Sequence, residues 1–229
     1  MAEAGAPEGT IVWSKRQEQG VGRRGRSRSS PEGNLYCSII LRPECDPASG
    51  ATLSFLIALA LYQAIAPVLK AGTEIKLKWP NDILISGRKI AGILLESKTR
   101  PDGKLDYVIV GTGVNITTYP PVTEGLPATS LSKEGSTAKV EEILSAYAYS
   151  LLEAYMIWKR DGFDPIRRQW LERATGIGTA ITVNLPGQTL EGVFAGLDGM
   201  GALILDLNSG ERKLITAGEV FIVPANGDQ

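Results

Sequence analysis

The stretch that decides the fold is KWPND at residues 78–82, followed by GRKIAGILLE at residues 87–96. Residues 75–78, 83–85 and 90–96 are short and apolar, which predicts three strands. A proline-stiffened turn that carries an amide and a carboxylate joins the first two strands. Ser86 and Gly87 suit a tight hairpin turn between the last two. The hairpin would return Lys89 to the start of a strand, where rigid backbone holds it.

Outward from this stretch, strands and helices alternate along the chain. Further strands are predicted at residues 10–15, 35–41 and 105–112. Helices are predicted at residues 49–70, with Ser49 as the cap, and at 139–160 and 165–173, from their apolar spacing. Residues 17–33 read as a glycine- and arginine-rich loop, and residues 117–136, rich in Pro, Gly and Thr, as a mobile loop.

From about residue 178 the chain changes to short strands separated by glycine turns. The predicted strands are at residues 180–185, 189–197, 202–206, 213–215 and 220–223. They indicate a small β-barrel. We therefore expect an α+β protein, with a mixed β-sheet and helices in residues 1–175 and the barrel in residues 176–229.

Composition excludes several classes of protein. The 229 residues carry a net charge of −1, which argues against a nucleic-acid binder that works through bulk charge. There is no histidine, so chemistry must depend on Lys, Arg, Asp, a metal or the substrate itself. The two cysteines have no metal or redox spacing. Residues 51–69 are apolar but include Pro67, and we expect a buried helix in a cytoplasmic protein with no membrane contact.

Two other segments carry groups that suit anionic ligands. In QEQGVGRRGR, residues 17–26, three glycines allow close approach of a ligand and arginines can grip phosphate or carboxylate oxygens. Alone it matches a dinucleotide fingerprint weakly, or is a flexible basic loop. In GTGVNI, residues 111–116, a strand ends in glycines and presents one amide, and such a segment is more often only a strand terminus. Asp82 suits Mg²⁺, although a lone lysine on a turn such as Lys89 is usually just solvated.

Together these motifs resemble a known family. QGxGRxGR, SPxGNLY, KWPND with GRKxAGIL, and GxGxN, in this order and spacing, resemble the catalytic domain of biotin–protein ligases. Residues 192–223 are similar to the C-terminal barrel of that family, so the resemblance spans about residues 10–223. It implies a class II synthetase-like biotin/lipoate ligase fold. It also implies that the chain uses ATP and Mg²⁺ to convert biotin to biotinyl-5′-AMP and transfers biotin to a lysine of a biotin carboxyl carrier protein.

The resemblance also implies roles for single residues. Lys89 and Arg23 would be catalytic, and Asp82 would hold Mg²⁺. The residues implied to contact biotin or the adenylate are Gln17, Gly20, Val21, Gly22, Arg23, Arg26, Lys89 and Asn115. A homodimer is compatible with the pattern, and DNA binding is not expected because no helix-turn-helix segment precedes the ligase region.

The chain departs from the family pattern at three places. A strand with a Ser/Thr-Thr-Asn stretch is expected before residue 10, and we expect the start codon to lie further upstream. Val21 stands where the loop usually has an arginine, and Arg28 where a tryptophan is common. The alternatives are a lipoate-type ligase or acyltransferase, a truncated biotin-binding protein with little activity, and a generic nucleotide-binding α+β domain.

Overall fold

The largest of the three β-sheets in the described residues has six strands. The computed structural model spans residues 1–229 and describes all of them except 23–26, 122–125 and 223–229. The strand order is β1 (Ile11–Ser14), β4 (Leu35–Leu41), β8 (Leu105–Val114), β7 (Arg88–Thr99), β6 (Asp82–Ile85) and β5 (Ile75–Lys78). Neighbouring strands are antiparallel. The α+β class is confirmed, and the parallel pairing expected of a mixed sheet is limited to single bridges such as Leu77–Ala174.

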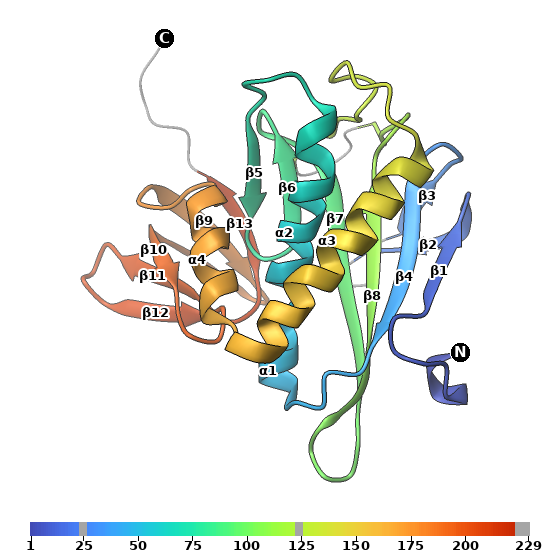
Figure 1. The fold of residues 1–229 in the computed structure, drawn as a ribbon. Coiled ribbons are helices and arrows are strands. Elements are labelled where there is room, and N and C mark those ends of the chain that lie inside the picture. The colour runs from blue at the N-terminus through green and yellow to red at the C-terminus, as the bar shows by residue number, and fades with distance from the viewer. Residues whose placement is uncertain (23–26, 122–125, 223–229) are drawn as a thin grey trace.

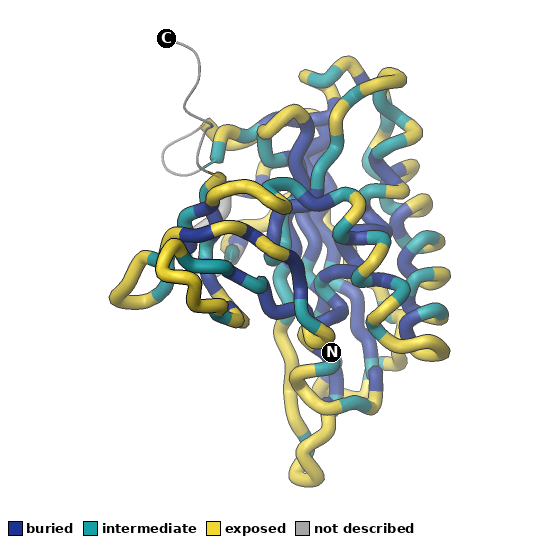
Figure 2. Tube along the Cα trace, turned by 90° about the vertical axis from the view of Figure 1, so that its left-hand side faces the viewer, coloured by how far each residue is buried: buried dark blue, intermediate teal, exposed yellow. Residues whose placement is uncertain are grey.

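Helices cover one face of this sheet (Figure 1). They are α1 (Pro47–Ala51), α2 (Leu53–Ile65), α3 (Val140–Asp161) and α4 (Asp164–Arg173). The Thr112 hydroxyl of β8 lies 3.1 Å from the Tyr147 hydroxyl of α3, and burial raises the pKa of that tyrosine. This bond identifies the face of β8 that carries Thr112 as the one turned toward the helices. The core lies between the two layers, where the tube is coloured as buried (Figure 2).

The first long helix begins earlier than the sequence suggested. Asp46 is the cap, because its carboxylate accepts a hydrogen bond from the Ser49 backbone at 2.9 Å, and Pro47 occupies the first turn. Ser49, predicted as the cap, is already helical. The stretch Pro47–Val68 is long and apolar enough to cross a membrane, but 61% of its most apolar 18-residue segment is buried inside the protein. It packs as a core helix, as expected.

The C-terminal strands form an open sheet, so the predicted closed barrel is wrong. The order is β12 (Arg212–Ile215), β11 (Leu203–Leu207), β10 (Gln188–Leu197), β9 (Ala180–Leu185) and β13 (Glu219–Ile222). Closure requires the two edge strands to pair with a matching stagger, and β12 and β13 each pair with a single inner strand. Trp79 anchors this sheet to the larger one, since its indole N–H donates to the Gly201 carbonyl at 3.1 Å.

Two segments precede β4: residues 17–33, whose structure differs from the predicted loop, and residues 1–9. The predicted loop at residues 17–33 contains a hairpin of β2 (Gln17–Val21) and β3 (Ser27–Ser30). Hairpins depend on backbone pairing, so a polar, glycine-rich sequence can form one without any hydrophobic alternation. Residues 1–9, which precede the first predicted strand, contain a 3₁₀ turn, Ala2–Ala4. Arg42 holds this segment through hydrogen bonds to the carbonyls of Ala2 and Ala6.

Candidate functional site

A smooth floor crosses the middle of the helix-free face. Tyr36 pairs with Gly113, Gly113 with Gly92, and Gly92 with Asp82. Directly paired residues of antiparallel strands project to the same face. Each of these four residues is next in sequence to one that faces the helices; Gly113, for example, follows Thr112. The row therefore lies on the opposite face. Its two central residues are glycines, so no side chain stands between Tyr36 and Asp82 in this row, and both glycines are buried.

Two lysines surround the carboxylate at the end of this floor. The Lys78 ammonium lies 4.0 Å from one oxygen of Asp82, and the Lys89 ammonium forms an ion pair with the other. Lys78 is buried, with 6% of its side chain exposed, whereas 35% of the Lys89 side chain is exposed. Phe221 of the C-terminal sheet lies with its ring centre 5.9 Å from the Lys78 ammonium. The cluster carries a net positive charge and leaves Lys89 accessible to an anion.

Asp82 does not fit the predicted role of Mg²⁺ ligand. Its carboxylate already interacts with two ammonium groups, and a divalent cation beside them would be repelled. No group of three or more His, Cys, Asp or Glu side chains gathers anywhere in the described part of the chain. Mg²⁺ usually binds through few protein carboxylates and several phosphate oxygens. The described carboxylates therefore do not form a Mg²⁺ site by themselves.

The segment after the undescribed residues 122–125 docks against Lys89. The Lys89 backbone N–H donates to the Pro127 carbonyl at 2.7 Å, and its carbonyl accepts from the Thr129 N–H at 3.0 Å. Residues 127 and 129 of the predicted mobile loop are thus hydrogen-bonded to both polar groups of the Lys89 backbone. Asn115 lies in the same network, because its side-chain N–H donates to the Thr129 carbonyl at 3.0 Å. The structure brings Lys89 and Asn115 together, although Asn115 uses its donor internally.

Part of the glycine–arginine segment lies in the β2–β3 hairpin. The Gln17 side-chain oxygen accepts from the Ser30 hydroxyl at 2.8 Å, so this amide holds the base of the hairpin. Gly20 is buried and Gly22 is half-buried. Arg23 and Arg26 lie outside the described residues, as do the side chains of Val21 and Arg28. Their predicted roles remain predictions.

One buried amide beside the floor was missed as a site residue. Asn34, 2% exposed, accepts hydrogen bonds from the backbone of residues 116, 117 and 118 and donates to the Tyr36 hydroxyl at 3.1 Å. It joins the end of β8 to the floor tyrosine. The SPxGNLY motif contains Asn34, but nothing local in the sequence shows that its partners lie some eighty residues away.

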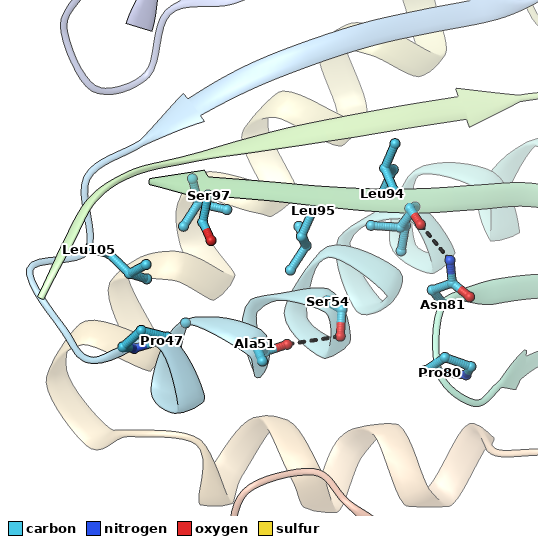
Figure 3. A pocket seen from close by; sticks show the side chains of 12 residues that line it. Pro47, Ala51, Ser54, Pro80, Asn81, Leu94, Leu95, Ser97 and Leu105 are labelled. Carbon is cyan, nitrogen blue, oxygen red and sulfur yellow. Dashed lines mark hydrogen bonds between the residues drawn. The ribbon is translucent and has the colours of Figure 1, made fainter. Parts of the chain in front are cut away.

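A separate cavity of about 270 Å³ lies behind the KWPND turn (Figure 3). Ala51 and Ser54 line it on the helix side, Pro80 and Asn81 at the turn, and Leu95 on β7. The Asn81 amide donates to the Ile93 carbonyl of β7, so it braces the turn. The predicted biotin, adenylate and metal residues within the described ranges do not line this cavity.

Comparisons with known proteins cover nearly the whole chain. The profile of the "Biotin/lipoate A/B protein ligase family" matches residues 1–115, and that of the "Biotin protein ligase C terminal domain" matches residues 176–223. A biotin–[acetyl-CoA-carboxylase] ligase of Paracoccus denitrificans is 38% identical over 219 residues, which is 92% of this chain and 89% of the relative. The bifunctional ligase/repressor BirA of Bacillus subtilis is 36% identical over 95% of this chain and 67% of its own length.

Solved structures show the same fold. The biotin protein ligase from Aquifex aeolicus in complex with biotin and ATP superposes with a TM-score of 0.82, at 24% identity, over 97% of this chain and 93% of that one. The Leishmania major biotin protein ligase in complex with biotinyl-5-AMP gives a TM-score of 0.61 at 22% identity, over 92% and 89% of the two chains.

Proposed function

The chain belongs to the biotin/lipoate A/B protein ligase family, and from that premise we propose that it is an ATP-dependent biotin–protein ligase. It activates biotin to biotinyl-5′-AMP and transfers the biotinyl group to a lysine of a carboxylase carrier domain. The observation that carries the proposal is the 38% identity to a biotin–[acetyl-CoA-carboxylase] ligase over 92% of the chain. The exposed Lys89 at the end of a glycine floor supplies the chemistry.

In the first step, a biotin carboxylate oxygen attacks the α-phosphorus of ATP. The new oxygen–phosphorus bond forms as the bond to pyrophosphate breaks, which gives a mixed anhydride. Both reactants are anions, so they repel each other until fixed cations offset the charge. Lys89 supplies such a cation, because its ammonium is ion-paired with Asp82 while 35% of its side chain stays exposed. Arg23 is proposed as the second cation and Arg26 as a phosphate contact.

The floor provides the surface on which the ligand lies. Backbone at Gly92 and Gly113 allows the flat ring system of biotin or the adenylate to rest against the sheet, between Tyr36 and the lysine cluster. The β2–β3 hairpin, with Gln17, Gly20, Val21 and Gly22, is proposed as its cover. A cover keeps water from the mixed anhydride until the acceptor lysine attacks its acyl carbon and releases AMP.

The finer assignments are proposals of the same kind. We place the division between the catalytic and C-terminal units at residue 175, which agrees with a C-terminal family match beginning at residue 176. Mg²⁺ enters as the ion that accompanies ATP. A homodimer, the absence of DNA binding and a cytoplasmic location remain predictions.

A carrier assay tests the proposal. The purified protein is incubated with ATP, biotin and a biotin carboxyl carrier domain, and the carrier is weighed by mass spectrometry. We expect one biotinyl group per carrier, dependent on ATP. Parallel reactions with lipoate and a lipoyl domain test the lipoate alternative. Biotin binding without any carrier modification would instead support the truncated binding protein.

A further inference from the structure

Thr129 is hydrogen-bonded to two proposed site residues, Lys89 and Asn115, through its backbone, and to Glu134 through its hydroxyl. Its N–H donates to the Lys89 carbonyl at 3.0 Å, and its carbonyl accepts from the Asn115 side-chain amide at 3.0 Å. Its hydroxyl donates to the Glu134 carboxylate. Thr129 is fully buried. The residue therefore sets the spacing between the strand that carries Lys89 and the strand end that carries Asn115.

Glu134 connects this threonine to the residue beside Lys89. One guanidinium nitrogen of Arg88 lies 2.9 and 3.0 Å from the two carboxylate oxygens of Glu134, whose side chain is 12% exposed. The segment also closes on itself, since the Glu134 N–H donates to the Ser130 carbonyl at 3.1 Å. Together, Thr129 and Glu134 hold the first two residues of β7: Thr129 bonds the backbone of Lys89, and Glu134 bonds the side chain of Arg88. We call this set of contacts the clamp.

We infer that Thr129 is a positioning residue for the adenylation step, acting through Lys89 and Asn115 with Glu134 and Arg88 as its support. This inference rests on the proposed function of the site. The exposed lysine side chain is flexible by itself, and what limits its position is the backbone from which it extends. That backbone is held on one side of β7 by Pro127 and Thr129.

The clamp also gives Arg88 a carboxylate partner different from that of Lys89. Arg88 and Lys89 are consecutive cations, and each has its own carboxylate, Glu134 for Arg88 and Asp82 for Lys89. With Arg88 occupied, Lys89 is the cation of this pair that meets the incoming carboxylate.

The test compares Thr129→Val, which keeps the shape and removes the hydroxyl, with Thr129→Ser, which keeps the hydroxyl. Biotin-dependent ATP–pyrophosphate exchange is measured per active site, with the active fraction titrated by the burst of biotinyl-AMP. We expect kcat of Thr129→Val to fall about 10- to 100-fold, as for a small misplacement of a catalytic group. KM for biotin should stay near that of the wild type, because the glycine floor is untouched.

Thr129→Ser should recover most of the lost rate, and Thr73→Val serves as the matched control, since its hydroxyl bonds only the nearby Lys70 carbonyl on the surface. A wild-type kcat per active site in Thr129→Val would overturn the inference. If Thr129→Val does not fold, Glu134→Gln decides in the same way, with a lowered kcat expected. A wild-type protein without any exchange would contradict the proposed function instead, so the two failures are distinct.

Discussion

Lys89 and Asp82 form an ion pair across the β6–β7 hairpin, with Lys78 on the other side of the same carboxylate. Lys89 and Asp82 are seven positions apart, and the Ser86-Gly87 turn brings them together. Ser86 and Gly87 both have positive φ, 47° and 74°. The pair orients an ammonium group that is still one-third exposed. This arrangement provides a fixed positive charge at the end of the floor.

Replacing Lys89 by alanine should strongly slow adenylate formation and leave the fold intact. The loss of one charge-stabilising group is expected to lower the ATP–pyrophosphate exchange rate about 10²- to 10³-fold. The side chain is partly exposed, so thermal unfolding should change little. Wild-type exchange by Lys89→Ala would refute the assigned role of the lysine.

Asp82→Asn separates a lysine-orienting role from a metal-binding role. We expect kcat to fall about tenfold because the ammonium is less well placed. The Mg²⁺ concentration that gives half-maximal rate should stay the same. A large rise in that concentration would mean that Asp82 holds the metal. Asp102→Asn, at the exposed tip of the β7–β8 hairpin, is the matched control.

Gly113→Val should block the floor without unfolding the sheet. A branched side chain suits an extended strand but would stand where the ligand lies, between Tyr36 and Gly92. We expect biotin affinity, measured by calorimetry, to fall at least about tenfold, which is roughly 1.4 kcal/mol. Ala180→Val, at an exposed strand position of the C-terminal sheet, should bind biotin normally.

Gly201→Ala should destabilise the contact between the C-terminal sheet and helix α2. Gly201 has φ +82°, and an added Cβ would lie 2.5 Å from the Phe55 ring. Strain and overpacking together should lower the free energy of unfolding by about 2–4 kcal/mol in urea titrations. Gly199→Ala is the control, because its Cβ would meet nothing within 4 Å. Equal stability of the two variants would contradict this account.

The Glu8 contact makes part of the stability depend on pH. Burial opposes ionisation, but hydrogen bonds from Tyr155, the Arg42 backbone and Lys159 outweigh it and hold the pKa of Glu8 below its ordinary value of 4.5. A lowered pKa stabilises the fold above pH 4.5, and this contribution is lost as pH falls through the folded-state value.

Glu8→Gln should therefore cost about 1 kcal/mol at neutral pH, and the difference from the wild type should shrink on acidification. Unfolding titrations at several pH values measure it, with Glu153→Gln on the exposed face of α3 as the control. A difference that does not vary with pH would show that the carboxylate charge is not involved.

Local patterns in the sequence determined most of the elements. The apolar runs gave β4, β5 and β9 with their observed bounds, and the amphipathic spacing gave α3 to within one residue at each end. Such patterns are local because burial on one side repeats with the period of the strand or helix. The family motifs likewise implied Lys89, Asp82 and Asn115 as parts of one site.

The tertiary structure alone decided how these parts interact. The open C-terminal sheet, the β2–β3 hairpin and the helix cap at Asp46 depend on which backbone groups meet. So does the link from Thr129 to Lys89, forty residues away, within a segment whose composition indicates only a loop. Composition cannot reveal such contacts, because a hydrogen bond depends on distance and direction in the folded chain rather than on residue type.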